Sequence, residues 1–166
     1  MQICKYIESP LGKLMLVSEN NMLTGILYDN QNYSYYFKNM AYEFKDISFF
    51  NDVEKWLNIY FSGSNPNFII PTFFYGTDFQ KRVWDILKTI PYGKSITYGN
   101  IAKIICSKYS IKTMSSQAVG QAVGKNPISI IIPCHRVLSL NNKITGYNGG
   151  IHRKKLLLEI ENIYYK

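Results

Sequence analysis

The chain has 166 residues, a formal net charge of +8 and hydrophobic residues at 46% of its positions. This length suits one or two small domains with enough apolar residues for a core, and no segment approaches the roughly 20 apolar residues of a membrane span. The three cysteines, Cys4, Cys106 and Cys134, include no Cys-x-x-Cys pair, so they indicate neither a disulfide framework nor a zinc ribbon, and we expect a cytoplasmic protein.

The first half of the chain reads as short strands and one helix. Alternating apolar residues predict an antiparallel meander with strands over residues 2–8, 13–18 and 22–28. Apolar residues at helical spacing then predict a helix over residues 52–61, which ends before Gly63. Residues 62–71 look like an exit loop that could contain one more strand, whereas residues 30–50 have no clean period and stay unassigned.

Helical patterns dominate from Thr77 onward. Thr77 is a suitable N-cap for a helix whose apolar stripe reaches Ile90 and which Pro91-Tyr92-Gly93 ends. A second helix is expected to start at Thr97, and a third to be capped by Ser115 or Ser116 and to stop before Asn126-Pro127. Two short helices around a turn are typical of a helix-turn-helix unit, although the small residues of the third helix would equally serve an ordinary helix pair.

The net charge changes sign along the chain. Residues 1–76 hold five Lys and seven Asp or Glu, a net charge of −2, whereas residues 77–166 hold fourteen Lys or Arg and four acidic residues, a net charge of +10. We therefore expect two domains that meet between residues 76 and 77. The basic domain is typical of a protein that faces a polyanion, most often nucleic acid, although a solvated lysine-rich surface has the same composition.

A thiol and an imidazole stand side by side in Pro133-Cys134-His135-Arg136, after an apolar strand expected over residues 128–132. A thiol needs a lowered pKa to act as a nucleophile at neutral pH, and a neighbouring base or cation is the usual means. Cys134 is therefore the first candidate for covalent chemistry. The pair alone is a weak signal, since a Cys beside an Ile run is more often a small core residue.

The last segment supplies a loop and a carboxylate. The adjacent Gly149 and Gly150 indicate a loop with positive φ or with room for a ligand. A final helix is expected over residues 151–163, with Leu156, Leu157 and Ile160 facing inward and His152 on its surface. Either Glu159 or Glu161 could return to His135 and complete a Cys-His-carboxylate relay.

The second half resembles the O6-alkylguanine-DNA alkyltransferases, in order and almost continuously from residue 78 to 161. The most specific match is Ile132-Pro133-Cys134-His135-Arg136-Val137, with a flanking Asn126-Pro127 and Gly146-Tyr147-x-Gly149-Gly150. The Ser9-Pro10-Leu11-Gly12 opening also resembles the start of the family's N-terminal domain. Further matches are Phe79-Gln80, Val83-Trp84, Ile90-Pro91-x-Gly93, Thr97-Tyr98-Gly99, Ile101-Ala102, Ala118-Val119-Gly120, Leu156-Leu157 and Glu161.

This resemblance implies an α+β chain. Its N-terminal part would be a small ribonuclease H-like α/β domain with an antiparallel sheet, and its C-terminal part a winged helix-turn-helix-like domain that binds DNA and holds the active site. The implied activity is direct-reversal DNA repair, in which the alkyl group on O6 of guanine, and possibly on O4 of thymine, moves to Cys134 in a single turnover. The partner would be double-stranded DNA containing O6-alkylguanine, bound by a monomer without cofactor, metal or membrane.

The resemblance also assigns roles to residues. Cys134 would be the nucleophile, activated through a water by His135, which Glu161 orients; Tyr98 would hydrogen-bond the guanine and help to protonate it, and Asn126 would brace the turn before the active-site strand. Because O6 cannot be reached inside the base stack, the base would be flipped out from the minor groove. The residues expected to contact DNA are Thr97, Tyr98, Ser116, Gln117, Ala118, Gly120, Lys125 and Arg136, and the pocket would comprise Val137, Tyr147, Asn148 and Gly149.

The chain departs from the family pattern at Gln117, where the recognition helix usually carries an arginine that fills the space of the flipped base. Glutamine can fill that space and hydrogen-bond the orphaned cytosine, but it lacks the charge and the stacking plane of a guanidinium. Three other readings stay open: a non-catalytic alkyl-lesion-binding protein, against which Cys134 argues; a transcriptional regulator; and a cysteine hydrolase that uses the same Cys-His-Glu trio.

Overall fold

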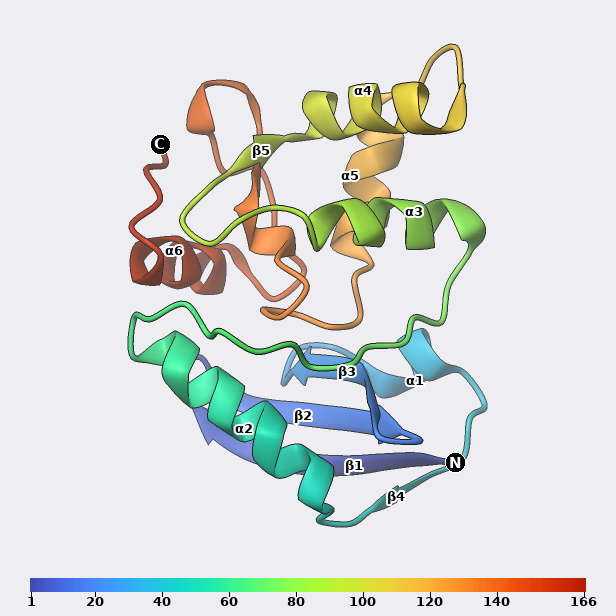
Figure 1. Ribbon diagram of the computed structural model, residues 1–166, viewed down its shortest axis with the longest axis vertical. Coiled ribbons are helices and arrows are strands. Elements are labelled where there is room, and N and C mark those ends of the chain that lie inside the picture. The colour runs from blue at the N-terminus through green and yellow to red at the C-terminus, as the bar shows by residue number, and fades with distance from the viewer. The chain divides into compact units, whose positions relative to one another are not determined.

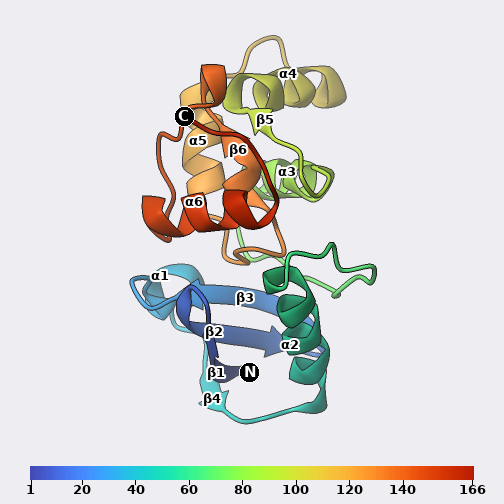
Figure 2. The same ribbon diagram turned by 90° about the vertical axis from the view of Figure 1, so that its left-hand side faces the viewer.

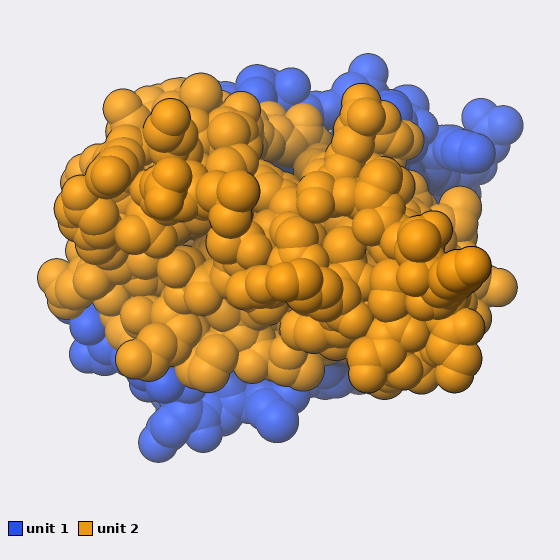
Figure 3. Space-filling view, turned by 90° about the horizontal axis from the view of Figure 1, so that it is seen from above, with its two compact units in different colours: residues 1–75, 127–129 blue, residues 76–126, 130–166 orange.

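The computed structural model describes residues 1–166, which divide into two compact units. The first unit comprises residues 1–75 and 127–129, and the second comprises residues 76–126 and 130–166 (Figure 3). The return of residues 127–129 to the first unit was not indicated by the sequence. No helix in the chain is both long and apolar enough to cross a lipid bilayer.

A four-stranded sheet forms the centre of the first unit (Figure 1). Its order is β3-β2-β1-β4, and β1, β2 and β3 are joined as the predicted antiparallel meander. The fourth strand, β4, pairs with β1 in parallel. We expected an antiparallel sheet, and the sheet is antiparallel only over β1, β2 and β3. The strands are β1 (Gln2–Ser9), β2 (Gly12–Glu19), β3 (Met22–Tyr28) and β4 (Tyr42–Phe44).

Helix α2 (Ser48–Phe61) runs across one face of this sheet (Figures 1 and 2). It buries side chains three and four residues apart, which include Val53, Leu57 and Tyr60, so the predicted helical spacing is confirmed with a start four residues earlier. The unassigned stretch contains β4 and the short helix α1 (Tyr33–Phe37). The strand considered within residues 62–71 does not form.

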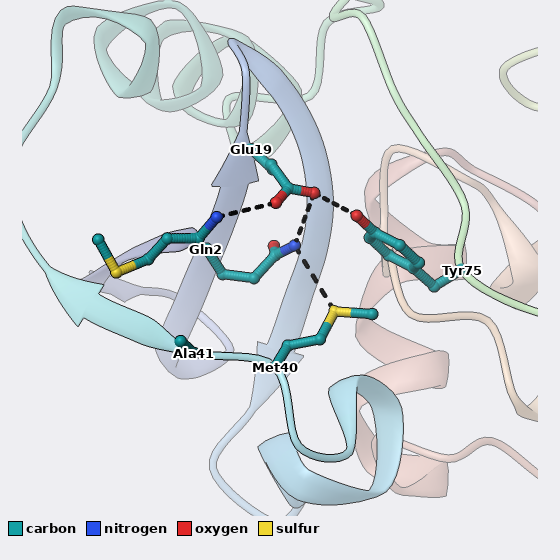
Figure 4. Close-up of a pocket in the computed structure, with 6 residues that line it drawn as sticks. Gln2, Glu19, Met40, Ala41 and Tyr75 are labelled. Atoms are coloured by element: carbon teal, nitrogen blue, oxygen red, sulfur yellow. Dashed lines mark hydrogen bonds and ion pairs between the residues drawn. The ribbon is translucent and has the colours of Figure 1, made fainter.

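Glu19, the last residue of β2, accepts hydrogen bonds from two parts of the first unit. Gln2 Nε2 donates to it at 3.1 Å, and the Tyr75 hydroxyl donates from the end of the unit. Figure 4 shows these three side chains lining a pocket with Met40 and Ala41. The carboxylate thus ties the chain at Tyr75 to the sheet, directly before the second unit begins.

Four helices and a two-stranded parallel sheet make up the second unit. The N-caps expected from the sequence are present: the Thr77 side chain accepts from Gln80 N at 3.1 Å within a capping box, and Ser115 accepts from Ala118 N at 3.0 Å. The elements are α3 (Asp78–Leu87), α4 (Tyr98–Tyr109), α5 (Ser116–Gly124), α6 (Ile151–Ile160), β5 (Ile96–Thr97), β6 (Val137–Leu138), and the 3-10 turns η1 (Cys134–Arg136) and η2 (Leu140–Asn142).

Helices α3, α4 and α5 pack together, and α4 with α5 forms the helix-turn-helix pair. The buried Trp84 of α3 donates its indole N–H to the Ala122 carbonyl at 2.8 Å, which fixes the end of α5 against α3. Helix α4 ends at Ser110, whose φ of 54° gives a left-handed cap and turns the chain toward α5. Helix α3 stops at Leu87, short of the Ile90 to which the apolar stripe extended.

The apolar run before Cys134 is not the strand that we predicted over residues 128–132. Ile128 makes one isolated bridge to Ile26, and the following residues form turns in which Ile130 has a φ of 71°. All three of Ile128, Ile130 and Ile132 are buried. The apolar run therefore predicted correctly that these residues are buried. Burial alone, however, does not distinguish a strand from a buried turn.

Candidate active site

Cys134 begins the single turn η1, directly after Pro133. Its side chain is only 6% exposed, so the thiol is inside the unit, where a charged form is disfavoured. Burial raises the pKa of Cys134, while a hydrogen bond with the Asn126 side chain, the positive charge of Lys154 and a hydrogen bond with Tyr147 act in the opposite direction. The surroundings thus contain groups that favour a thiolate.

His135 and Glu161 are brought together by η1 and by the residue that follows α6. His135 Nε2 lies 2.6 Å from Glu161 Oε2, and both side chains are buried. A carboxylate only accepts hydrogen bonds, so Nε2 carries the proton and the buried Nδ1 holds the lone pair. Of the two acids considered for this role, Glu161 occupies it, and Glu159 instead accepts a hydrogen bond from the Tyr165 hydroxyl at 2.7 Å.

Arg136 completes the charge balance of this cluster. Its Nε donates to Glu161 Oε1 at 2.8 Å, a second guanidinium N–H donates to the same carboxylate, and a third donates to the Ile90 carbonyl at 2.6 Å. Burial alone would raise the pKa of Glu161, but the bonds from His135 and Arg136 outweigh it and hold this pKa below its ordinary value. Burial lowers the pKa of His135 despite the nearby carboxylate, so the imidazole is neutral at neutral pH.

Asn126 connects the end of α5 to the residues before the thiol. Its Nδ2 donates to the Ile132 carbonyl at 2.8 Å, and its side chain also hydrogen-bonds with Cys134. The amide is almost completely buried. The bracing contact assigned to Asn126 is therefore present, although what it braces is a turn and not a strand.

Tyr98 is the first residue of α4, and its phenol hydrogen-bonds with the Thr145 side chain. Thr145 in turn accepts a hydrogen bond from the Ser139 hydroxyl at 3.0 Å. Gly120 of α5 faces the Tyr98 ring, since a Cβ built on this glycine would lie 3.6 Å from it. Helix α5 therefore lies against Tyr98 at Gly120, where a methyl group would make an ordinary van der Waals contact with the ring.

The residues expected to contact DNA differ in their exposure. Ser116, Gln117 and Lys125 are exposed, whereas Ala118 and Gly120 are half-buried on α5. Thr97 caps α4 by accepting from Asn100 N at 3.1 Å. The buried Arg136 is paired with Glu161, so the structure does not bring its guanidinium to the surface with the others.

The predicted pocket residues lie on β6 and on the loop before α6. Val137 and Gly149 are buried, Tyr147 is half-buried and Asn148 is exposed. Gly150 has a φ of 97° and is the N-cap of α6, which explains why one of the two adjacent glycines is required. Nowhere in the chain do three or more His, Cys, Asp or Glu side chains gather as metal ligands would.

Sequence reasoning missed Lys154, because it placed the buried face of α6 one step away from its true position. The helix buries Leu157 and Leu158, whereas the predicted inward residue Leu156 is exposed. Lys154 and Glu161 are buried on the same face. Leu157, Leu158 and Glu161 follow Lys154 at spacings of three, four and seven residues, which place all four side chains on one side of a helix. This spacing was available in the sequence, but a lysine on an apolar stripe is normally assigned to the surface.

Two family models match the chain. The model described as "6-O-methylguanine DNA methyltransferase, ribonuclease-like domain" matches residues 3–73, and the one described as "6-O-methylguanine DNA methyltransferase, DNA binding domain" matches residues 78–163. Among curated proteins, the methylated-DNA--protein-cysteine methyltransferase of Mycobacterium tuberculosis is 42% identical over 155 residues, which cover 93% of this chain and 89% of the relative.

Solved structures resemble the chain over nearly its whole length. A crystal structure of the Mycobacterium tuberculosis O6-methylguanine methyltransferase has a TM-score of 0.80 and 41% identity, and the match covers 97% of this chain and 93% of the chain in the crystal structure. A crystal structure of Mycobacterium tuberculosis OGT in complex with DNA has a TM-score of 0.81 and 39% identity, and the match covers 96% of this chain and 92% of the OGT chain. These similarities extend over both units.

Proposed function

This chain belongs to the 6-O-methylguanine DNA methyltransferase family, and we propose that Cys134 is the residue on which its reaction takes place. It is a methylated-DNA--protein-cysteine methyltransferase that binds DNA and repairs it by direct reversal. In such a reaction an alkyl group leaves O6 of guanine and becomes bound to a cysteine of the protein. The observation that carries our assignment is the 2.6 Å contact between His135 Nε2 and Glu161 Oε2, at the residue that follows Cys134 in the chain.

The proton of the Cys134 thiol would pass to His135 Nδ1 through a water. The thiolate then attacks the alkyl carbon, so that a sulfur–carbon bond forms while the bond between that carbon and O6 breaks, and the electron pair returns to the purine. Glu161 supports this step because its negative charge stabilises the protonated imidazole. The product is a thioether, and no group in the cluster is suited to hydrolyse it, so each molecule acts once.

Tyr98 is the proposed proton donor to the leaving base. A neutral guanine is a better leaving group than its anion, so a hydroxyl that protonates the ring as the carbon–oxygen bond breaks lowers the barrier. Burial raises the pKa of Tyr98, which keeps the phenol protonated at neutral pH. The hydrogen bond from Thr145 holds this side chain at the first turn of α4.

The DNA would be bound through the exposed residues of α5, with the alkylated guanine flipped out of the minor groove. Gln117 and Lys125 are exposed on or next to this helix. Gln117 would occupy the space left by the base, and Lys125 would meet a phosphate. The protein would act as a monomer, and the substrate would be O6-alkylguanine in double-stranded DNA.

Intact-protein mass spectrometry tests this assignment. The protein is incubated with a short duplex that contains one O6-methylguanine, in parallel with Cys134→Ala and with Cys106→Ala as a matched control. We expect the parent and Cys106→Ala to gain one methyl group, mapped to Cys134, and Cys134→Ala to gain none. A methyl group on another residue would refute the role of Cys134, and binding of the duplex without any mass gain would favour a non-catalytic lesion-binding protein.

A further inference from the structure

Helix α6 carries a buried cation that takes no part in the proton transfers proposed above. Lys154 is 1% exposed, although a lysine is rarely buried without a partner. Its Nζ donates to the Val137 carbonyl at 2.6 Å and to the Gly146 carbonyl at 3.0 Å. These two carbonyls account for two of the three N–H donors of an ammonium group.

The two carbonyls belong to the two chain segments that border Cys134. Val137 directly follows η1, which Cys134 begins, and Gly146 directly precedes Tyr147, whose side chain hydrogen-bonds with Cys134. The ammonium is therefore fixed by backbone atoms and does not depend on a mobile side chain. A fixed charge in a desolvated site acts strongly on its neighbours, because little solvent screens it.

When Lys154 is protonated, the charges around the thiol balance if Cys134 is ionised. Glu161 is negative and Arg136 is positive, so this pair is neutral, and His135 is kept neutral by burial. Lys154 then remains as a positive charge, and Cys134 is the ionisable group whose charge acts on it. Asn126 and Tyr147, the other side chains that act on the thiol, are uncharged at neutral pH.

We propose that Lys154 is the electrostatic partner of the Cys134 thiolate and sets the pH at which this thiol becomes nucleophilic. The inference rests on the proposed function, in that Cys134 must be the acceptor for the effect to matter in repair. Lys154 acts through Cys134, so it is a positioning residue. His135 would then receive the proton of the thiol, while the positive charge of Lys154 would stabilise the negative charge that remains on the sulfur of Cys134.

The direction of the pKa shifts agrees with such a pair. Burial lowers the pKa of Lys154 to about 8, and the charge of Cys134 opposes that shift. Burial raises the pKa of Cys134, and Lys154 opposes this shift in turn. Each charged form is costly alone inside the unit, and each is less costly in the presence of the other.

A purely structural role for Lys154, as a clasp between α6 and the two carbonyls, is the competing explanation. Lys154→Gln separates the two, because an amide retains N–H donors for the carbonyls but has no charge. Lys154→Met retains the packing of the aliphatic part of the side chain and loses both the N–H donors and the charge. Lys155→Gln is the matched control, since Lys155 is the next residue of α6 and is exposed.

The experiment is a titration of the Cys134 thiolate in the full chain with Cys4→Ala and Cys106→Ser, so that one thiol remains. Thiolate absorbance and the rate of alkylation by iodoacetamide are followed against pH. We expect Lys154→Gln and Lys154→Met to raise the midpoint by about one pH unit or more, which leaves about tenfold less thiolate near neutral pH. Lys155→Gln should titrate as the parent does. A parent-like midpoint in Lys154→Gln would overturn the proposal.

A reciprocal measurement avoids any loss of folding in the Lys154 variants. Coupling between two titrating groups is mutual, so Cys134→Ser should lower the pKa of Lys154, followed by NMR of the lysine side chain. An unchanged Lys154 titration in Cys134→Ser would also overturn the pairing. Neither measurement uses DNA, so a missing methyl transfer would refute the proposed function while leaving this test intact.

Discussion

His135 and Glu161 are 26 residues apart in the chain, yet their side chains meet at 2.6 Å inside the second unit. The contact fixes which ring nitrogen carries the proton and leaves Nδ1 as the basic atom. It joins the turn that bears the thiol to the end of α6, so the same bond serves both the chemistry and the packing of the unit. Arg136 binds the same carboxylate and makes it a buried ion pair.

Replacing this carboxylate should therefore impair both stability and transfer. In Glu161→Gln the guanidinium of Arg136 stays buried without its counter-charge, which costs about 3–5 kcal/mol of the unfolding free energy. The imidazole also loses its orienting anion, and we expect transfer to slow by about a hundredfold. Denaturant unfolding and single-turnover rates measure the two effects.

Glu159→Gln is the control for this variant, because Glu159 is exposed near the end of α6, two residues before Glu161, and accepts its hydrogen bond from the Tyr165 hydroxyl. Its unfolding free energy should stay within about 0.5 kcal/mol of the parent. If Glu161→Gln and Glu159→Gln lost the same unfolding free energy, the contact of Glu161 with His135 and Arg136 would not stabilise the fold.

The pH dependence of stability follows from the same cluster. Burial lowers the pKa of His135 in the folded state, so the unfolded chain binds the proton more readily. The stabilisation is complete above the unfolded pKa of about 6.5 and declines as pH falls from there toward the lower folded pKa. We expect the unfolding free energy to decrease between about pH 7 and pH 5, with a shallower slope in His135→Gln.

His152→Gln serves as the reference in that experiment, since His152 is the other histidine of the chain and is exposed on α6. Its slope should match the parent's over the same interval. If His135→Gln retained the parent's slope, the decline would have to come from other titrating groups.

Local signals in the sequence predicted most of the helices and strands. Thr77 and Ser115 cap their helices through bonds that span three residues, so the information lies within the pattern itself. The pairing of β4 with β1 in parallel depends on residues forty positions apart, and no local period reports it. Residues 128–132 were misassigned because their apolar pattern indicates burial, and a buried turn has the same pattern as a buried strand.

The site was predicted in part. Neighbouring residues, such as Cys134 and His135, carried a visible signal, and the resemblance correctly indicated which acid would reach the imidazole. Lys154 was missed because the sequence rule sends lysine to the surface, and its two acceptors are backbone carbonyls, which leave no trace in the sequence. A buried charge of this kind becomes visible only when the carbonyls are located in space.

Gln117 offers a test of how the chain holds a flipped base. The side chain is exposed on the first turn of α5, where an arginine would add a fixed charge and a stacking plane. We expect Gln117→Arg to transfer the methyl group from duplex DNA at least as fast as the parent, and Gln117→Ala to be slower by about tenfold, which corresponds to about 1.4 kcal/mol.

Gln121→Ala is the matched control, because Gln121 is exposed on the same helix one turn later. The rates should be compared on duplex DNA and on free O6-benzylguanine. A wedge affects only the duplex, so parent-like duplex rates in both Gln117 variants would show that this position does not fill the gap.

Ile130 lies four residues before the thiol in a backbone conformation that β-branched residues rarely adopt. Its φ of 71° is in the left-handed region, which costs a non-glycine residue about 1–2 kcal/mol, and its side chain is fully buried. Ile130→Gly and Ile130→Ala remove nearly the same side chain, but only glycine relieves the backbone. We therefore expect Ile130→Gly to be more stable than Ile130→Ala by about 1 kcal/mol in denaturant unfolding. At Val119, buried within α5, the order should be reversed, because glycine destabilises a helix interior by about 1 kcal/mol relative to alanine. If alanine were more stable than glycine at Ile130 as well as at Val119, the turn before Cys134 would store no backbone strain.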